Sequence, residues 1–475
     1  MNPKTLGIFG GAALLSAAAL FLVVRGQVVA PPTTPTNYPP PPPPPPVNVG
    51  QPQATVSFGN AVRATATLSQ SHVLADSATD LFLNVDLQAA NQPGARSPFA
   101  AVLVIDRSGS MAGVKIDDAR DAALAFMRKL RDDDMIAVVS YGSDVTTDLR
   151  LSPVRDVRDL AQRRVMSIDA GGGTNIGGGL RAAIRELATT SMPRRVLLIS
   201  DGRPTEGERN PVRLAAIAGD GREQGLTFSS MGVGLDYDEN VMERIAIRGG
   251  GGFYHLRKTS ALASILAKEF QAVESLVASR VRLRIDPGAN MQIQEVFGYN
   301  ATRDGNSMVV DLGDLSSGES RRLVARATAR PSGQNVHPFA SLGLTYQMPA
   351  SGGGESAQGL LSVAAVHDQA LAGRSQNADV MVAGYKVEAA AAVSASMEAM
   401  SRNDKTQAVQ VLRDAKARMK KAAANAPAAA APALRQQAVY FDDMDTKAGA
   451  ADLGSAAGQD FVKSNRAEAF SSQRR

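Results

Sequence analysis

Between residues 97 and 275, short apolar runs alternate with segments in which apolar residues recur every three or four positions. Residues 100–105 form a continuous apolar run, which is typical of a strand buried on both faces of a parallel sheet. Residues 116–130 follow with apolar side chains at helical spacing. The same alternation predicts strands at 136–139, 196–199, 226–233 and 253–256, and helices at 177–187, 211–223, 240–246 and 261–273. A βαβ repeat of this kind predicts an α/β fold with a doubly wound, mostly parallel sheet.

On both sides of this segment, polar and apolar residues alternate with the period of two that antiparallel strands require. The first block covers residues 51–96 and the second covers residues 276–370. The predicted strands lie at 62–68, 81–85, 281–285, 291–296, 308–312, 322–326 and 342–346. Neither block closes a core readily on its own. We therefore expect both to belong to one β-sandwich, into which the α/β domain of residues 97–275 is inserted.

The C-terminal part of the chain is rich in alanine and helical in pattern. Residues 378–400 and 404–424 predict a helical hairpin within residues 376–425, with Asn403 or Asp404 as the N-cap of its second helix. Pro427 and Pro432 interrupt this pattern. From residue 426 to residue 475 the sequence predicts a flexible tail.

The N-terminus carries an uncharged stretch of 19 residues, 6–24, between Lys4 and Arg25. As a helix it would be ~28 Å long, close to the ~30 Å of a bilayer core, so residues 1–30 are expected to be a membrane anchor. A signal peptide cleaved before Pro31 is the alternative. Residues 31–50 include eight consecutive prolines and predict an extended linker. Either reading places the bulk of the chain outside the cytoplasm, in the periplasm or on the cell surface.

Composition excludes several classes of function. The 51 Lys and Arg residues exceed the 46 Asp and Glu residues by only 5, and the excess is spread along the chain, so nucleic acid is not an expected partner. The chain has no cysteine, which excludes disulfides, thiol catalysis and zinc–thiolate sites. The four histidines, His72, His255, His337 and His367, lie far apart in sequence and lack a metal-binding spacing.

Three turns carry side-chain oxygens at the ends of predicted strands or in a glycine-rich loop. Asp106, Ser108 and Ser110 follow the strand of residues 100–105, and Thr174 follows three consecutive glycines. Asp201 ends the strand of residues 196–199. Open α/β sheets bind ligands at the carboxyl edge of their strands, and carboxylates with hydroxyls suit Mg²⁺, Ca²⁺ or Mn²⁺.

These three pieces resemble the metal-ion-dependent adhesion site of the von Willebrand factor type A family, including its Asp-x-Ser-x-Ser signature at residues 106–110. The resemblance covers about 180 residues and includes all five expected positions. It implies that Ser108, Ser110 and Thr174 supply hydroxyl ligands, while Asp106 and Asp201 hold the ion directly or through water. The wider layout resembles that of exported bacterial envelope proteins of the same family.

The resemblance implies a binding module that captures an Asp or Glu side chain of a protein partner through the cation, and not an enzyme. Arg107 and Arg203 flank the turns and can favour an acidic patch. A structural envelope protein, in which the metal mainly stabilises the fold, is the alternative. A metal-dependent phosphoesterase is less favoured, because no general base, nucleophile pair or phosphate-binding loop is evident. The partner's identity and the oligomeric state stay open.

Overall fold

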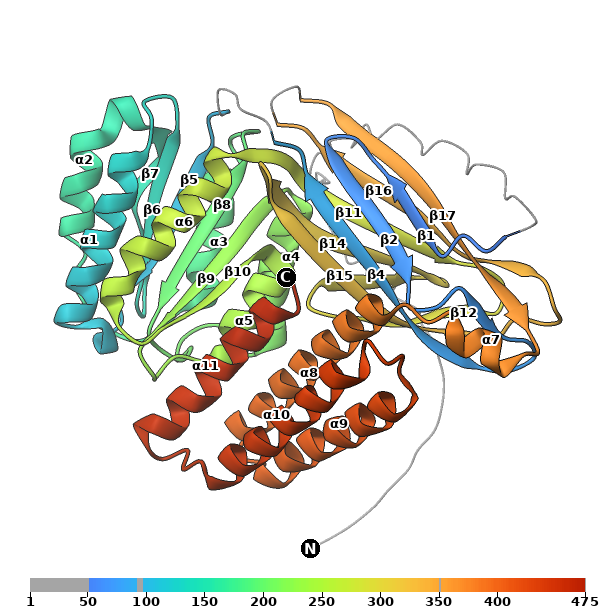
Figure 1. The fold of residues 1–475 in the computed structure, drawn as a ribbon. Coiled ribbons are helices and arrows are strands. Elements are labelled where there is room, and N and C mark those ends of the chain that lie inside the picture. Colours follow the sequence, from blue (N-terminus) through green and yellow to red (C-terminus); the bar gives the residue numbers. More distant parts are fainter. Residues whose placement is uncertain (1–50, 92–96, 350–351, 475) are drawn as a thin grey trace, which may run out of the picture. The chain divides into compact units, whose positions relative to one another are not determined.

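A computed structural model describes residues 51–91, 97–349 and 352–474 (Figure 1). The anchor or signal peptide expected at residues 1–30 and the proline-rich linker of residues 31–50 lie outside these ranges. Among the described residues, no helix combines the length and the apolar character needed to cross a membrane.

The α/β part is built on a six-stranded sheet with the strand order β10-β9-β8-β5-β6-β7. All neighbouring strands run parallel except β6 and β7, which are antiparallel. The strands are β5 (Ala100–Asp106), β6 (Met135–Tyr141), β7 (Val145–Pro153), β8 (Arg194–Ser200), β9 (Leu226–Val233) and β10 (Gly250–Leu256). The order reverses beside β5, the topological switch point at which such sheets bind ligands.

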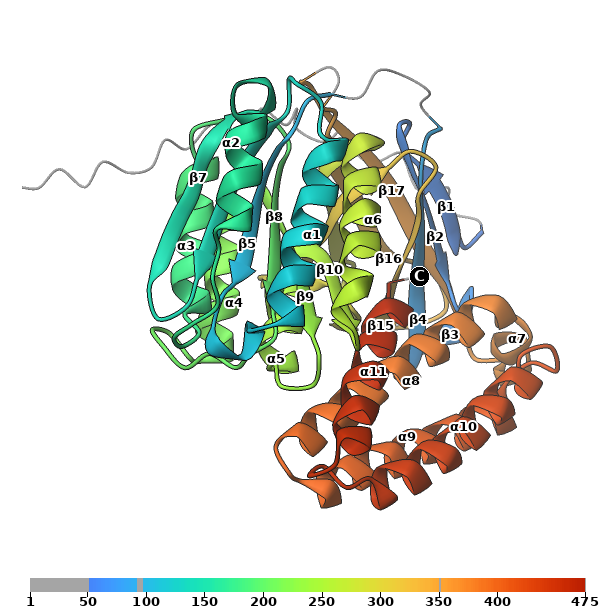
Figure 2. The same cartoon turned by 90° about the vertical axis from the view of Figure 1, so that its left-hand side faces the viewer.

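Helices cover both faces of this sheet. Helices α1, α2 and α6 lie on one face of the sheet and α3, α4 and α5 on the other (Figure 2). The side chains of each set share a core with the sheet. The helices are α1 (Val114–Lys129), α2 (Val154–Met166), α3 (Ile176–Leu187), α4 (Pro211–Glu223), α5 (Glu239–Gly249) and α6 (Leu262–Glu274), with short 3-10 helices η1 (Gly109–Met111) and η2 (Thr259–Ala261). Every residue of β5 is buried, which explains its unbroken apolar run. The predicted α/β class is confirmed.

The flanking strands form two sheets with the orders β1-β2-β4-β15-β12 and β13-β14-β11-β16-β17-β3. The strands from the first block are β1 (Thr55–Phe58), β2 (Val62–Leu68), β3 (His72–Leu74) and β4 (Thr79–Ala89). Those from the second are β11 (Leu276–Pro287), β12 (Met291–Val296), β13 (Asn300–Asp304), β14 (Ser307–Ser316), β15 (Ser320–Ala329), β16 (Val336–Gln347) and β17 (Gly354–Val366).

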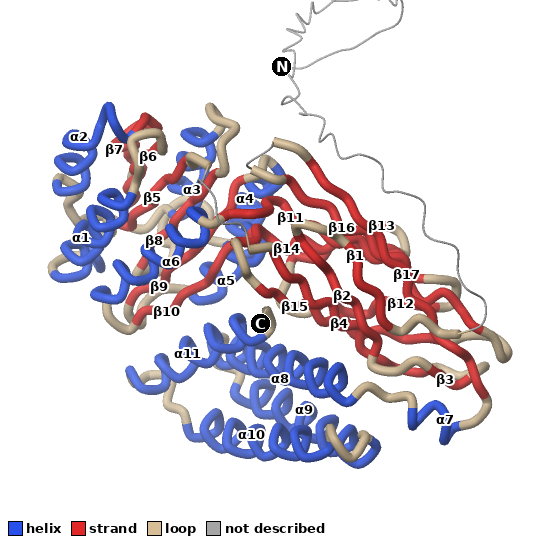
Figure 3. The backbone as a smooth tube through the Cα atoms, turned by 45° about the horizontal axis from the view of Figure 1, so that its top comes forward, coloured by secondary structure: helices blue, strands red, loops and turns tan. Residues whose placement is uncertain are grey.

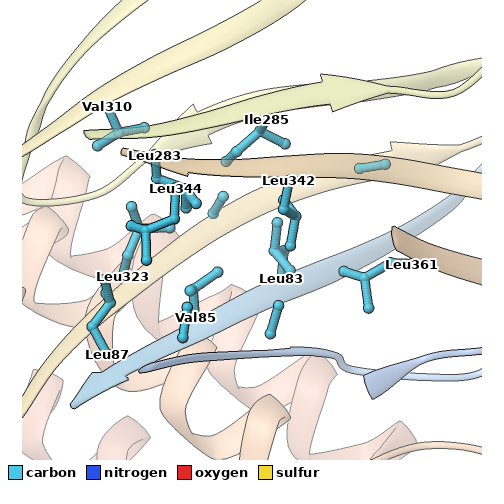
Figure 4. Packing of buried hydrophobic residues seen from close by; sticks show 14 of the residues in the cluster. Leu83, Val85, Leu87, Leu283, Ile285, Val310, Leu323, Leu342, Leu344 and Leu361 are labelled. Carbon is cyan, nitrogen blue, oxygen red and sulfur yellow. The ribbon is translucent and has the colours of Figure 1, made fainter. Parts of the chain in front are cut away.

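The two blocks of strands complete each other. Strand β4 pairs with β15 in antiparallel register, with Leu83 opposite Ala325, although the α/β part separates them in sequence. Leu83 and Val85 of β4, Leu283 of β11 and Leu342 of β16 are fully buried in one shared core (Figure 4). The α/β domain is thus inserted into a β-sandwich, as the sequence predicts.

The C-terminus differs from the prediction. The short helix α7 (Gln369–Arg374) precedes the expected hairpin of α8 (Ala378–Ser401) and α9 (Lys405–Asn425). The predicted flexible tail, residues 426–475, instead contains α10 (Ala431–Ala450) and α11 (Ala456–Ser472), which lie against α9 and α8 (Figure 3). Pro432 stands in the first turn of α10, where proline is tolerated because the nitrogen there needs no helical partner. The prediction of a tail was wrong because Pro432 lies in the first turn of a helix instead of interrupting one.

Candidate metal site

The carboxylate of Asp106 lies at the end of β5 and is fully buried. Its Oδ1 accepts a hydrogen bond from the backbone N–H of Ser108 at 2.8 Å, and its Oδ2 accepts one from the hydroxyl of Ser200 at 2.6 Å. In the absence of a cation, burial raises the pKa of Asp106 to about 6; the hydrogen bonds from Ser108 and Ser200 oppose this shift, and the charge of Asp201 adds to it. A positive charge at this position would offset the cost of burying the carboxylate.

The two serines of the first turn connect Asp106 to the third turn. The Oγ atoms of Ser108 and Ser110 are 3.1 Å apart, and Ser110 donates a hydrogen bond to Oδ1 of Asp201 at 2.7 Å. Ser108 and Asp201 are buried, whereas Ser110 is exposed. The cluster therefore reaches solvent on the side of Ser110.

Thr174 joins the same cluster from the loop before α3. Its backbone N–H donates to the hydroxyl of Thr205 at 2.9 Å, and the carbonyl of Gly172 in the same loop accepts from the N–H of Gly109 at 3.0 Å. A Cβ atom at position 202 would lie 3.1 Å from Oγ1 of Thr174 and 3.5 Å from Oγ of Ser110. The structure thus brings all five predicted residues together.

Two groups beside the cluster were not predicted from the sequence. Lys115, in the first turn of α1, donates to Oδ2 of Asp201 at 2.5 Å, and its Nζ atom lies 3.9 Å from the carboxylate of Asp236. Ser200, the last residue of β8, is the second such group, because its hydroxyl donates a hydrogen bond to Asp106. A cation just after the serine signature is the one sequence signal that points to Lys115. Of the two flanking arginines, Arg203 is exposed and Arg107 is partly buried.

The donors fit a hard divalent cation. Two oxygens on adjacent corners of a Mg²⁺ octahedron are about 3 Å apart for ligand distances of about 2.0–2.1 Å, and the Ser108 and Ser110 oxygens have that separation. Hydroxyls and carboxylates are the ligands that Mg²⁺, Ca²⁺ and Mn²⁺ prefer. Within residues 51–91, 97–349 and 352–474, no three His, Cys, Asp or Glu side chains gather into a metal-binding group, and the candidate site itself combines two carboxylates with hydroxyls.

Comparison with known sequences concerns the α/β part as a whole. Residues 101–268 match the model of the von Willebrand factor type A domain. The α/β part of the chain thus has the von Willebrand factor type A fold. Domains of this type are protein-interaction and adhesion modules and are generally not enzymes. The chain is also 26% identical over 270 residues to an uncharacterized protein of Synechocystis, an alignment that covers 54% of this chain and 63% of the relative's length.

Two solved structures share the fold beyond the type A domain. A von Willebrand factor type A protein from Catenulispora acidiphila superposes with a TM-score of 0.62 and 20% identity, covering 79% of this chain and 90% of that one. VWA2, an ArnB paralogue from Sulfolobus acidocaldarius, superposes with a TM-score of 0.60 and 17% identity, covering 87% and 99%. At these identities the likeness concerns the fold alone.

Proposed function

We propose that the protein binds a divalent cation at its type A domain and uses it to capture an Asp or Glu side chain of a protein partner. The observation that carries this proposal is the convergence of three hydroxyls and two carboxylates from three separate turns, with Ser110 at the solvent side. A bound Mg²⁺, Ca²⁺ or Mn²⁺ would supply a coordination position for an outside carboxylate.

The protein's own residues have distinct roles in this proposal. Ser108, Ser110 and Thr174 supply neutral oxygens, while Asp106 and Asp201 supply negative charge. Both carboxylates already accept hydrogen bonds, Asp106 from Ser200 and Asp201 from Ser110, which fixes their orientation. A partner's carboxylate would approach from the side of Ser110, because the other members of the cluster are buried.

Metal binding is tested by titrating Mg²⁺ into chelator-treated full-length protein by calorimetry, with the melting temperature as a second readout. We expect wild type to release or absorb heat and to melt at a higher temperature with Mg²⁺. A double variant, Asp106→Ala with Ser108→Ala, should show neither effect. Thr189→Val, which removes an exposed hydroxyl at the end of α3, is the matched control and should behave as wild type. If Mg²⁺ produces neither heat nor a higher melting temperature in wild type, the proposal is wrong.

Partner capture separates this function from a purely structural role for the metal. With Mg²⁺ present, a resin carrying blocked glutamate peptides should retain wild type, and chelator should release it at temperatures where the protein stays folded. If chelation only lowers the melting temperature and the resin retains nothing, the cation stabilises the fold and does not bind a carboxylate. Absence of phosphatase activity with Mg²⁺ would agree with a binding module.

Display from a membrane is the remaining part of the proposal. It is motivated by the apolar stretch of residues 6–24 and by the proline-rich linker that follows it. Fractionation of cells that produce the full chain should place it in the envelope, and a chain lacking residues 1–30 should remain in the cytoplasm. Recovery of the full chain in the cytosolic fraction would contradict this part alone.

A further inference from the structure

Lys115 places a third charged group against the cluster. Its ammonium lies 2.5 Å from Oδ2 of Asp201, whose other oxygen accepts the hydrogen bond from Ser110. The Lys115 side chain is 30% exposed and the Asp201 side chain is fully buried. One carboxylate oxygen of Asp201 therefore pairs with the ammonium of Lys115, and the other contacts Ser110, one of the proposed metal ligands.

The position of Lys115 in α1 makes this contact informative. The first turn of a helix carries the positive end of the helix dipole, which disfavours a lysine. Among the described residues, its second acidic neighbour is Asp236, at 3.9 Å and with a side chain that is 73% exposed. The buried carboxylate of Asp201 is thus the main counter-charge of Lys115.

The formal charges of Asp106, Asp201 and Lys115 show what the contact between Lys115 and Asp201 changes. Asp106 and Asp201 contribute −2, Lys115 contributes +1, and a divalent cation would bring the total to +1. Without the ammonium, the loaded site would be neutral. Charges a few ångströms apart near a protein surface interact appreciably, so this difference affects both the cation and any anion that approaches it.

We propose that Lys115 sets the charge of the metal site: it lowers the affinity for the divalent cation and leaves the loaded site with a net positive charge that favours a partner's carboxylate. This inference rests on the proposed function. It assigns a role to a residue outside the five proposed ligands, and it leads to a specific prediction. Removal of the charge must change metal affinity and carboxylate affinity in opposite directions.

The metal arm of the test compares three variants by Mg²⁺ calorimetry on chelator-treated full-length protein. Lys115→Met keeps the length of the side chain without its charge and should bind Mg²⁺ about tenfold more tightly than wild type. Lys115→Arg keeps the charge and should bind within about threefold of wild type. Lys129→Met, at the exposed far end of the same helix, is the matched control and should not differ. Equal or weaker Mg²⁺ binding by a folded Lys115→Met protein overturns the proposal.

The carboxylate arm uses a blocked Gly-Glu-Gly peptide at saturating Mg²⁺, with Gly-Gln-Gly as the neutral control. Lys115→Met should bind the glutamate peptide about tenfold more weakly than wild type, while Lys115→Arg retains it. Unchanged peptide affinity in Lys115→Met would refute the role of Lys115 in partner capture. If wild type and Lys115→Met both fail to bind Mg²⁺, the proposed function itself fails. If wild type binds Mg²⁺ and Lys115→Met binds it equally, only the role of Lys115 fails.

Discussion

The ammonium of Lys463 lies 2.5 Å from Oε2 of Glu239, and the two side chains are only 5% and 9% exposed. The same ammonium donates to the carbonyl of Tyr237 at 2.6 Å. Lys463 belongs to α11, the last helix of the chain, whereas Tyr237 and Glu239 belong to the type A domain. Burial opposes the ionisation of Glu239, but the charge of Lys463 and its hydrogen bond, together with the charge of Arg466, outweigh burial and lower the pKa of that carboxyl.

Loss of this contact should destabilise the protein. Lys463→Met leaves Glu239 buried without its cation, and we expect the free energy of unfolding to fall by about 3 kcal/mol, the lower end of what breaking a buried pair costs. Urea denaturation measures the change. Lys447→Met, which removes an exposed lysine paired with Asp443, should cost less than about 0.5 kcal/mol. If Lys463→Met unfolds at the same urea concentration as wild type, the contact does not hold α11 in place.

Gly202 lies between two of the proposed ligands, so a methyl group there should weaken metal binding without unfolding the protein. The Cβ atom of a Gly202→Ala variant would lie 3.1 Å from Oγ1 of Thr174, which has to move by a few tenths of an ångström to accommodate it. Oγ of Ser110, at 3.5 Å, would be in ordinary van der Waals contact with the same methyl group. We expect Mg²⁺ affinity to fall by at least about tenfold, equivalent to about 1.4 kcal/mol. Calorimetry checks this. Gly449→Ala, where a Cβ meets open space, should leave the affinity unchanged.

Asp314 holds two arginines of the type A domain against the sandwich. Its Oδ2 lies 2.8 Å from Nη1 of Arg195, and its Oδ1 lies 3.3 Å from Nη1 of Arg222. Burial alone would raise the pKa of Asp314, but Arg195 and Arg222 outweigh it and hold the pKa well below the usual value of 3.8. Because the folded pKa is depressed, this stabilisation is complete above about pH 4 and is lost as the pH falls through the folded pKa.

Asp314→Asn should therefore lower the free energy of unfolding at pH 7 by about 3 kcal/mol. It should also lose less stability than wild type between pH 5 and pH 3, because it lacks the group that titrates. Urea denaturation at several pH values measures both effects. An acid sensitivity identical to that of wild type would show that Asp314 is not the group responsible.

His255 should make the protein less stable below neutral pH. Its Nδ1 lies 2.9 Å from the hydroxyl of Tyr237 and its Nε2 lies 3.3 Å from Oδ1 of Asp460 in α11. Burial lowers the pKa of His255 below the usual 6.5; Asp460 opposes this shift, and Lys463 and Arg257 add to it. The unfolded chain therefore takes up the proton first, so stability falls as the pH drops below about 6.5.

His255→Gln removes this titration. Between pH 7.5 and pH 5.5 its melting temperature should fall less than that of wild type, which calorimetric melting measures. His367→Gln replaces an exposed histidine and should follow the wild-type profile. A His255→Gln profile parallel to that of wild type would contradict the assignment.

Much of the type A domain could be predicted from the sequence because its signals are local. The helix at 211–223 and the strand at 226–233 have the predicted bounds, since period and capping residues are properties of neighbouring positions. The edge strand β7 and the helix α2 were not predicted. Most residues of β7 are only partly buried, so its alternation is weak. Val154, Val157, Ala161 and Val165 of α2 do recur at helical spacing, so this helix could have been predicted from the sequence.

The sequence by itself determined the alternation of strands and helices and the burial of β5, and it was enough to identify the five candidate metal ligands. Each of these depends on side chains close together along the chain. Only the tertiary structure decided that the turns of Asp106, Thr174 and Asp201 meet, that Lys115 contacts Asp201 and that α11 lies against the type A domain. These are contacts between residues 30 to more than 200 positions apart, such as Thr174 with Thr205 and Lys463 with Glu239. Their formation depends on strand order and on burial, which no local pattern encodes.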